Sequence, residues 1–412
     1  MARPNVTIKI IDESLVAPIG ETTSPGIGAL CSRKGLVTDL GYTGEKQSGL
    51  MTVESISDWF GRLRYRAEFL GISFGMTGST LQGAIGASAA ELIDIGGSGY
   101  TAAWQKEWWA VHNFLQYGGS CLVGGTGSVS NTSPVTGSLS DPTIGYDVIF
   151  HGDTAATDYT NLKTIVDSRA SSELPVLGVA ASTIADYATD LTNMTNEFYV
   201  KVAGHKYHLN ATGQGDLDAG KLVLTNMSPD VAGCITRCDR DSYPWFSPAG
   251  RARGRILNVV RLLQNPTVSQ QDTLFDAGVN PIVTFPGEGT LLFGDKTGAS
   301  NTSTLSRINV SRLFIYLRKV INPIARSILF EINDATTRAR FVLAATTVLE
   351  TVKGQRGITD YRVICDETNN TPDLVQARIF VADILVKPTI AINYVRITFT
   401  NKNLNDNLSG NL

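Results

Sequence analysis

The clearest hydrophobic pattern lies between residues 306 and 388, where two apolar stripes recur at helical spacing. One stripe comprises Val310, Leu313, Phe314, Leu317, Val320 and Ile321, and the other Phe341, Ala344, Ala345, Val348, Leu349 and Val352. Spacings of three and four residues place each set on one face of a helix. Two strand-type runs follow, at 361–365 and 378–386. The pattern predicts a compact α+β unit over 306–388, closed by Pro388.

Upstream, short apolar runs alternate with helical segments. Strands are predicted at 146–150, 175–180 and 198–202, with a helix at 159–170 between the first two. This order predicts a right-handed crossover onto a parallel sheet. Ser228-Pro229 opens a further helix, with Ser228 as its cap. Nearer the N-terminus the pattern predicts helices at 55–66 and 102–117 and a strand at 121–123.

The same pattern divides the chain into segments. The Gly/Ser/Thr-rich loop at 124–142 and the Gly/Pro-rich stretch after residue 241 mark irregular connections. The predicted segments are an N-terminal arm at 1–24, an outer α/β region at 25–145, an α/β region at 146–250, a connecting irregular segment at 251–305, the C-terminal domain at 306–388 and a C-terminal arm at 389–412.

Both ends of the chain show strand patterning beside a Pro or Gly breaker. Val6, Ile8 and Ile10 alternate with polar residues near the start. Residues 390–400 form a final β segment that contains Ile392, Tyr394, Val395, Ile397 and Phe399. A lone strand leaves backbone groups unpaired, so each end must join its own sheet or that of a neighbour.

Composition narrows the function classes. The 412 residues carry a net charge of −3, without the basic excess that is typical of nucleic-acid binders. No apolar run approaches the ~18 residues of a membrane helix, and no secretory signal opens the chain. We therefore expect folding in a cytoplasm, with five scattered cysteines present as reduced, mostly buried thiols.

No chemical motif predicts catalysis, a cofactor or a metal. His112, His151, His205 and His208 are available for a Ser-His-Asp triad, but no Gly-x-Ser-x-Gly elbow accompanies them. In a strand, His205 and His208 would point to opposite faces, and Cys234 and Cys238 fit one buried helical face better than a zinc site. Gly124-Gly125-Thr126-Gly127 lacks the following helix that a phosphate loop needs.

Several polar signatures in fixed order resemble one family. They include Asn309-Val310-Ser311-Arg312, Phe330-Glu331-Ile332-Asn333-Asp334, Gly354-Gln355-Arg356-Gly357 and Val363-Ile364-Cys365-Asp366. Weaker pieces are Ala110–Gly119, Val231-Ala232-Gly233, Ser247-Pro248-Ala249-Gly250, Gly278–Ile282, Gly287-Glu288-Gly289 and Phe293–Thr297. Together they resemble the contractile tail sheath proteins of bacteriophages. The family often has Pro at the position of Ile332, and residues 27–100 match it least.

The resemblance implies an α+β / α/β multidomain fold, with a subtilisin-like α/β region outside and the C-terminal domain and arms inside. It further implies a virion protein, assembled in the host cytoplasm, that forms stacked six-subunit rings around a tail tube. The rings contract to drive the tube through the host envelope for genome delivery. Baseplate and tail terminator proteins are the other implied partners, without nucleic acid or membrane insertion.

Two sets of residues are assigned on this basis. Strand exchange between subunits would use Val6, Ile8, Ile10, Ile392, Tyr394, Val395, Ile397 and Phe399. About 15 extended residues span at most ~50 Å, enough to reach an adjacent subunit. The tube-facing candidates are Arg312, Arg318, Lys319, Arg338, Arg340, Lys353 and Arg356, although each also fits an ordinary solvated helix face.

Two alternatives remain open at this stage. The first is the sheath of a phage-derived contractile injection device, which one sequence cannot separate from a phage tail. The second, from a different class, is a subtilisin-fold hydrolase, which predicts a monomer with a reactive serine instead of a large polymer.

Overall fold

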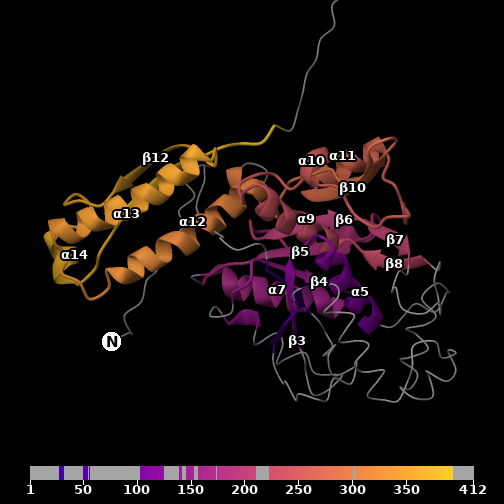
Figure 1. Ribbon diagram of the computed structural model, residues 1–412, viewed down its shortest axis with the longest axis horizontal. Helices are drawn as coiled ribbons and strands as arrows, with labels where there is room; N and C mark the ends of the chain where they lie inside the picture. The colour runs from indigo at the N-terminus through magenta and orange to yellow at the C-terminus, as the bar shows by residue number, and fades with distance from the viewer. Residues whose placement is uncertain are drawn as a thin grey trace, which may run out of the picture.

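An eight-stranded sheet lies at the centre of the larger part of the molecule, the α/β body (Figure 1). The computed structural model describes residues 27–31, 50–53, 55, 103–124, 139–141, 145–152, 156–172, 174–209, 222–299 and 303–392. The sheet order is β11-β10-β6-β5-β4-β1-β3-β2. Its strands are β1 (Ile27–Cys31), β2 (Leu50–Val53), β3 (Ser120–Gly124), β4 (Val148–His151), β5 (Leu177–Ser182), β6 (Tyr199–Ala203), β10 (Val279–Phe285) and β11 (Gly289–Leu292).

The six inner strands run parallel, from β10 through β6, β5, β4 and β1 to β3. The two edge strands, β2 and β11, pair antiparallel with their neighbours. All side chains of β4, β5 and β6 are buried, and apart from His151, Ser182 and Lys201 these strands are runs of apolar residues and glycine instead of alternating ones.

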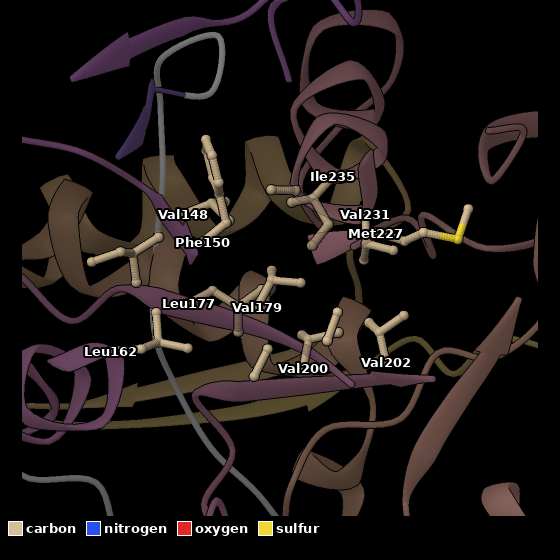
Figure 2. Close-up of a cluster of buried hydrophobic side chains, with 14 of the residues drawn as sticks. Val148, Phe150, Leu162, Leu177, Val179, Val200, Val202, Met227, Val231 and Ile235 are labelled. Atoms are coloured by element: carbon tan, nitrogen blue, oxygen red, sulfur yellow. The ribbon is translucent and has the colours of Figure 1, made fainter. Parts of the chain in front are cut away.

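Helices cover both faces of this sheet. α9 (Ser228–Asp241) packs on β4 and β5 beside α5 (Ala103–Leu115), and α7 (Ala156–Ala170) packs on the opposite face. Figure 2 shows Met227, Val231 and Ile235 on the α9 side of the strands and Leu162 of α7 on the other. The sheet is therefore the middle layer of an α/β sandwich.

A small second sheet extends the body, in the order β8-β7-β9. Its strands are β7 (His205–Leu209), β8 (Leu222–Asn226) and β9 (Arg261–Leu262). Short helices α8 (Tyr187–Asp190), α10 (Gly250–Arg253) and α11 (Val268–Asp276) complete the body. Thr267 and Gln270 form a capping box at the start of α11, which explains where that helix begins.

The C-terminal unit, residues 303–392, projects from the body in Figure 1. It contains the 3-10 turn η1 (Thr304–Ser306), α12 (Ile308–Ser327), α13 (Ala335–Gly354), β12 (Ile358–Ile364), α14 (Pro372–Gln376) and β13 (Asp383–Pro388). β12 and β13 pair antiparallel as a two-stranded sheet that lies along α13. Asp334 caps α13 by accepting a hydrogen bond from Thr337 N at 2.7 Å.

Helix α12 is shared by two hydrophobic cores. Ile308 and Ile315 belong to the core of the body, whereas Leu313, Phe314 and Leu317 belong to the core of the C-terminal unit. The amphipathic stripe predicted from the sequence is the second of these faces. The opposite face is also buried, which a single apolar stripe did not indicate.

The fold class is confirmed as mixed α+β / α/β, and the parallel crossover from β4 through α7 to β5 is as predicted. Three expectations need correction. Residues 251–305 are not irregular, because they supply α11, β10 and β11. The second strand of the hairpin begins at Asp383 and not at residue 378. Ser228 is not a cap but the first helical residue of α9, and its hydroxyl instead donates to His151 O at 2.7 Å.

The predicted helix at 55–66 lies outside the described residues except at Ser55. The predicted domain boundaries and the subtilisin-like character of the α/β region stay predictions. No helix in the described part of the chain is long and apolar enough to cross a bilayer.

Close packing of α9 on α5 gives a stability prediction. A Cβ at Gly233 would lie 2.3–3.0 Å from three atoms of Tyr117. That ring cannot easily move, because its hydroxyl donates to Asp230 and accepts from Leu257 N. We expect Gly233→Ala to lower the free energy of unfolding by about 1–3 kcal/mol, measured by urea denaturation. In the control Gly354→Ala, the added Cβ would meet no neighbouring side chain or segment within 4 Å. This variant should be as stable as the wild type or more stable by up to ~1 kcal/mol. Equal effects of the two variants would contradict the packing argument.

Candidate assembly interface

The β12–β13 hairpin has one buried and one solvent-exposed face. Tyr361, Val363, Ile384 and Val386 pack against the core of the C-terminal unit, as the period of two requires. Asp360, Arg362, Asp383, Leu385 and Lys387 are exposed on the other face. Among the described residues, helix α13 therefore covers one side of the sheet and the other side is exposed.

Both outer edges of this hairpin lack a third strand among the described residues. A two-stranded sheet exposes a row of backbone N–H and C=O groups along each edge, and these groups can pair with an added strand. The chain leaves β13 in the same region: Thr389 N donates to Gly357 O at 3.1 Å, and Ile390 and Ile392 are then 64% and 84% exposed. The unit thus combines open strand edges with an apolar segment that leads away from it.

Side-chain amides hold the ends of the hairpin. Asn370 is 2% exposed; its Nδ2 donates to Val381 O at 2.7 Å, and its Oδ1 accepts from Val381 N at 2.9 Å. Asp366 Oδ1 accepts from Thr368 N at 2.8 Å, which closes the turn after β12. These bonds fix the turn and set the start of β13.

The loop between α12 and α13 is fixed in a similar way. Asn333 Nδ2 donates to Ile379 O at 3.1 Å, and Asn333 Oδ1 accepts from Arg338 Nε at 2.9 Å. The exposed Phe330 in this loop adopts φ 71°, a left-handed conformation that bulky residues rarely take. The Phe330–Asp334 signature therefore encodes a helix junction.

Gly357 is required by a contact with the body. Its would-be Cβ lies 2.9 Å from Trp245 Cδ2, and Trp245 Nε1 donates to Gln355 O at 3.0 Å. Only a residue without a side chain lets the indole lie this close to the backbone. The Gly354–Gly357 signature thus joins the C-terminal unit to the segment that follows α9.

The seven predicted tube-facing cations lie in different environments. Arg312, Arg318 and Lys319 point from α12 into the body, toward Asp239, Ser172 O and Asp147 respectively. Arg338 is 8% exposed and is engaged by Asn333. Those four have little surface to offer a partner, because protein groups of the same chain already occupy them. Arg340 on α13 and Arg356 just after it are exposed, whereas Lys353 is half-exposed with its Nζ 3.9 Å from Asp360 Oδ1.

The outward face of α13 carries few charges. Leu343 is 71% exposed at its centre, between Ala339 and Thr347. Thr347 Oγ1 donates to Leu343 O at 2.8 Å and Thr351 Oγ1 to Thr347 O at 2.9 Å. Because these hydroxyls are already hydrogen-bonded, the face can lose water at little cost. Arg340 lies near one end of this face and Lys353 near the other.

Of the predicted strand-exchange residues, only Ile392 is described, and it is exposed. Val6, Ile8, Ile10, Tyr394, Val395, Ile397 and Phe399 lie outside the described residues. Their role stays a prediction.

The histidines lie inside the body. The ring centroid of Trp109 is 4.9 Å from that of His112 and 4.8 Å from that of His208, both edge-on. His151 Nε2 accepts a hydrogen bond from Ala181 N of β5 at 2.9 Å, so this ring nitrogen is occupied by backbone. Cys234 and Cys238 are buried on α9, where burial raises the pKa of each thiol to about 12. Among the described residues, no group of His, Cys, Asp or Glu is arranged to hold a metal ion.

Comparisons with known proteins support the resemblance to tail sheath proteins. Residues 300–402 match the family called phage tail sheath C-terminal domain. The chain therefore carries a sheath-type C-terminal domain, and the resemblance seen in the sequence is confirmed. This chain is 38% identical over 213 residues to the tail sheath protein of Enterobacteria phage T4 and 42% identical over 173 residues to that of Vibrio phage KVP40.

The aligned parts cover 52% and 42% of this chain, but only 31% and 26% of those two relatives. The chain thus spans about a third or less of the curated relatives it matches. Its fold is similar along nearly its whole length to chains in the anti-feeding prophage baseplate and in the contracted sheath of an extracellular contractile injection system called PVC. The TM-scores are 0.69 and 0.66, with 98% of this chain covered and 15% and 14% identity. At this identity the match shows the fold alone.

The amide network at the hairpin turn generates a prediction. Asn370→Asp removes the donor to Val381 O and places a carboxylate beside that carbonyl oxygen. We expect a loss of about 1–3 kcal/mol in the free energy of unfolding, by chemical denaturation. Gln376→Glu, the same chemical change at an exposed position of α14, serves as the control and should have little effect. An Asn370→Asp variant as stable as the wild type would mean that the network does not hold the hairpin.

The buried His112 predicts a pH dependence. Burial lowers its pKa from 6.5 to about 4, so the folded chain resists a proton that the unfolded chain accepts. The neutral His112 therefore contributes its full share to the free energy of unfolding above pH 6.5. That contribution, up to ~3 kcal/mol, is lost as the pH falls toward 4. Urea midpoints measured from pH 7 to 4.5 should fall more steeply for the wild type than for His112→Gln. Identical slopes would show that His112 takes no part.

Proposed function

We propose that the chain is a structural subunit of a contractile tail sheath. It polymerises as stacked six-subunit rings around a tail tube, and contraction drives the tube through the host envelope for genome delivery. The observation that carries the proposal is the sheath C-terminal domain with an open-edged β12–β13 hairpin. The protein acts by assembly and has no catalytic role. It resides in the virion tail after assembly in the host cytoplasm, with the tube, baseplate and tail terminator as partners.

Strand addition would provide the link between subunits. The arm segments with Val6, Ile8 and Ile10, and with Ile392, Tyr394, Val395, Ile397 and Phe399, have the alternation needed to extend a sheet. The open edges of β12 and β13 are suited to receive them. Main-chain pairing would tolerate rotations at the joints between subunits, because it depends on backbone hydrogen bonds and little on side-chain fit.

The outward face of α13 is the surface we assign to the tube. Leu343 and the internally bonded threonines make it easy to dehydrate, and Arg340, Lys353 and Arg356 supply positive charge near its ends. Positive charge at these positions would complement an acidic tube surface. Rim charges of this kind favour specificity and rate of association more than affinity.

A phage-derived contractile injection device is the second candidate. The fold match to the anti-feeding prophage and PVC chains, over 98% of this chain, is compatible with this candidate. In such a device the same polymer would surround a tube that carries no genome. A subtilisin-fold hydrolase is not supported by any residue arrangement in the described part of the chain.

Assembly of the chain alone tests the proposal. We expect negative-stain electron microscopy of the purified full chain to show regular tubes or stacked rings. A version without residues 1–20 should remain monomeric while keeping the circular dichroism spectrum and melting temperature of the folded protein. That unchanged fold is the control for a specific loss of assembly.

The other outcomes separate the parts of the proposal. Tubes from both versions would keep the sheath and remove the N-terminal arm from the mechanism. A folded monomer from both at high protein concentration would contradict self-assembly as the function. Labelling of either version by an active-site serine probe would return the hydrolase to consideration.

A further inference from the structure

A row of charged residues lies at the seam where α12 meets the α/β body. The face of α12 that points to the body carries Ile308 and Ile315, but it also carries Arg312 and Lys319. Arg312 Nη2 donates to Asp239 Oδ2 near the end of α9. About two helical turns further along α12, Lys319 Nζ donates to Asp147 Oδ1 at 2.9 Å, just before β4.

These pairs are largely removed from solvent. The side chains of Arg312 and Asp239 are 3% and 4% exposed, and those of Lys319 and Asp147 are 27% and 3% exposed. Both carboxylates come from the body and both cations from α12. The partners are 73 and 172 residues apart in sequence, so only the docked arrangement brings them together.

The Arg312–Asp239 pair is not built for maximal stability. Arg312 Nε and Nη1 donate to no atom, and Asp239 Oδ1 accepts from none, within the described residues. Burial raises the pKa of Asp239 to about 7, although Arg312 beside it acts in the opposite direction. A buried ion pair with unfilled hydrogen-bonding capacity roughly breaks even against apolar side chains of similar volume.

The pair nevertheless restricts the orientation of α12 on the body. Apolar contacts such as those of Ile308 and Ile315 tolerate small rotations and shifts, because dispersion is non-directional. A charge pair in a buried place does not tolerate them, since each shift leaves a desolvated charge without its partner. Sliding α12 by one turn would break the Arg312 and Lys319 contacts together.

We propose that the Arg312–Asp239 and Lys319–Asp147 pairs form a charged joint that fixes the orientation of the C-terminal unit on the body and adds little to stability. The joint acts within a single chain, so it holds whether or not the proposed assembly function is correct. Its consequence for any polymer is that force on the C-terminal unit reaches the body without rotation at the seam.

The test separates stability from orientation in the full chain. Arg312→Met, Asp239→Leu and the double variant are compared by urea denaturation. Spin labels on non-natural residues at the exposed Thr164 of α7 and Thr347 of α13 report the distance between body and C-terminal unit. This labelling leaves the native cysteines untouched.

Each single variant should lower the denaturation midpoint, because it leaves one buried charge unpaired. The double variant should return to the wild-type midpoint or above it, yet its label-to-label distance distribution should be about twofold wider or shifted. If a single variant fails to fold, the midpoint and the distance distribution of the double variant still test the proposal.

Two results would contradict the proposal that these pairs fix the orientation of the C-terminal unit. A double variant with a distribution as narrow as the wild type would show that the Arg312–Asp239 pair is not needed to fix the orientation. A double variant that is as unstable as the single variants would show that the Arg312–Asp239 pair mainly stabilises the fold. The exposed pair Lys387–Asp360, at 3.7 Å on the hairpin, provides the control: Lys387→Met with Asp360→Leu should change neither measurement.

Discussion

Burial of both faces of α12 is the constraint on which the rest of the structure depends. A helix on the surface of a domain buries one stripe and solvates the other. α12 instead packs one face on α13 and the hairpin and the other on the body, through Ile308 and Ile315. The C-terminal unit consists of two long helices and a two-stranded sheet, too thin to bury a large core without support. Its position and much of its order therefore depend on the contact that α12 makes with the body.

The same arrangement explains why the charged side chains of α12 are internal. Ser311 Oγ donates to Glu197 O at 2.8 Å and Arg318 Nη1 to Ser172 O at 3.3 Å, so polar groups along this face find partners in the body. A wholly apolar face would bury as much surface, but it would specify one docking geometry less strictly. Trp245, in the segment after α9, adds a further contact: its Nε1 donates to Gln355 O, and its indole lies close to Gly357.

With the inner face of α12 occupied, the exposed surfaces of the C-terminal unit among the described residues include the outer face and edges of the β12–β13 hairpin and the outward side of α13. These differ in chemistry. The hairpin edges offer backbone hydrogen bonds, which bind extended chain with little dependence on sequence. The outward side of α13 offers a flat surface with one exposed leucine. The proposed assembly through the arms relies on the first of these surfaces, and the proposed contact with a second partner relies on the other.

The sequence by itself determined the long helices α5, α7, α9, α12 and α13, most of the parallel strands and the relationship to tail sheath proteins. Apolar periodicity and short polar signatures are local, and they reflect local physics such as capping by Asp334 or the turn at Asp366. It did not reveal β10, because Asn280 and Pro281 interrupt its apolar run. Only the tertiary structure decided which cations are buried. Arg312 and Lys319 look like solvated helix residues until Asp239 and Asp147, which no local pattern links to them, are brought beside α12 by the folding of the body.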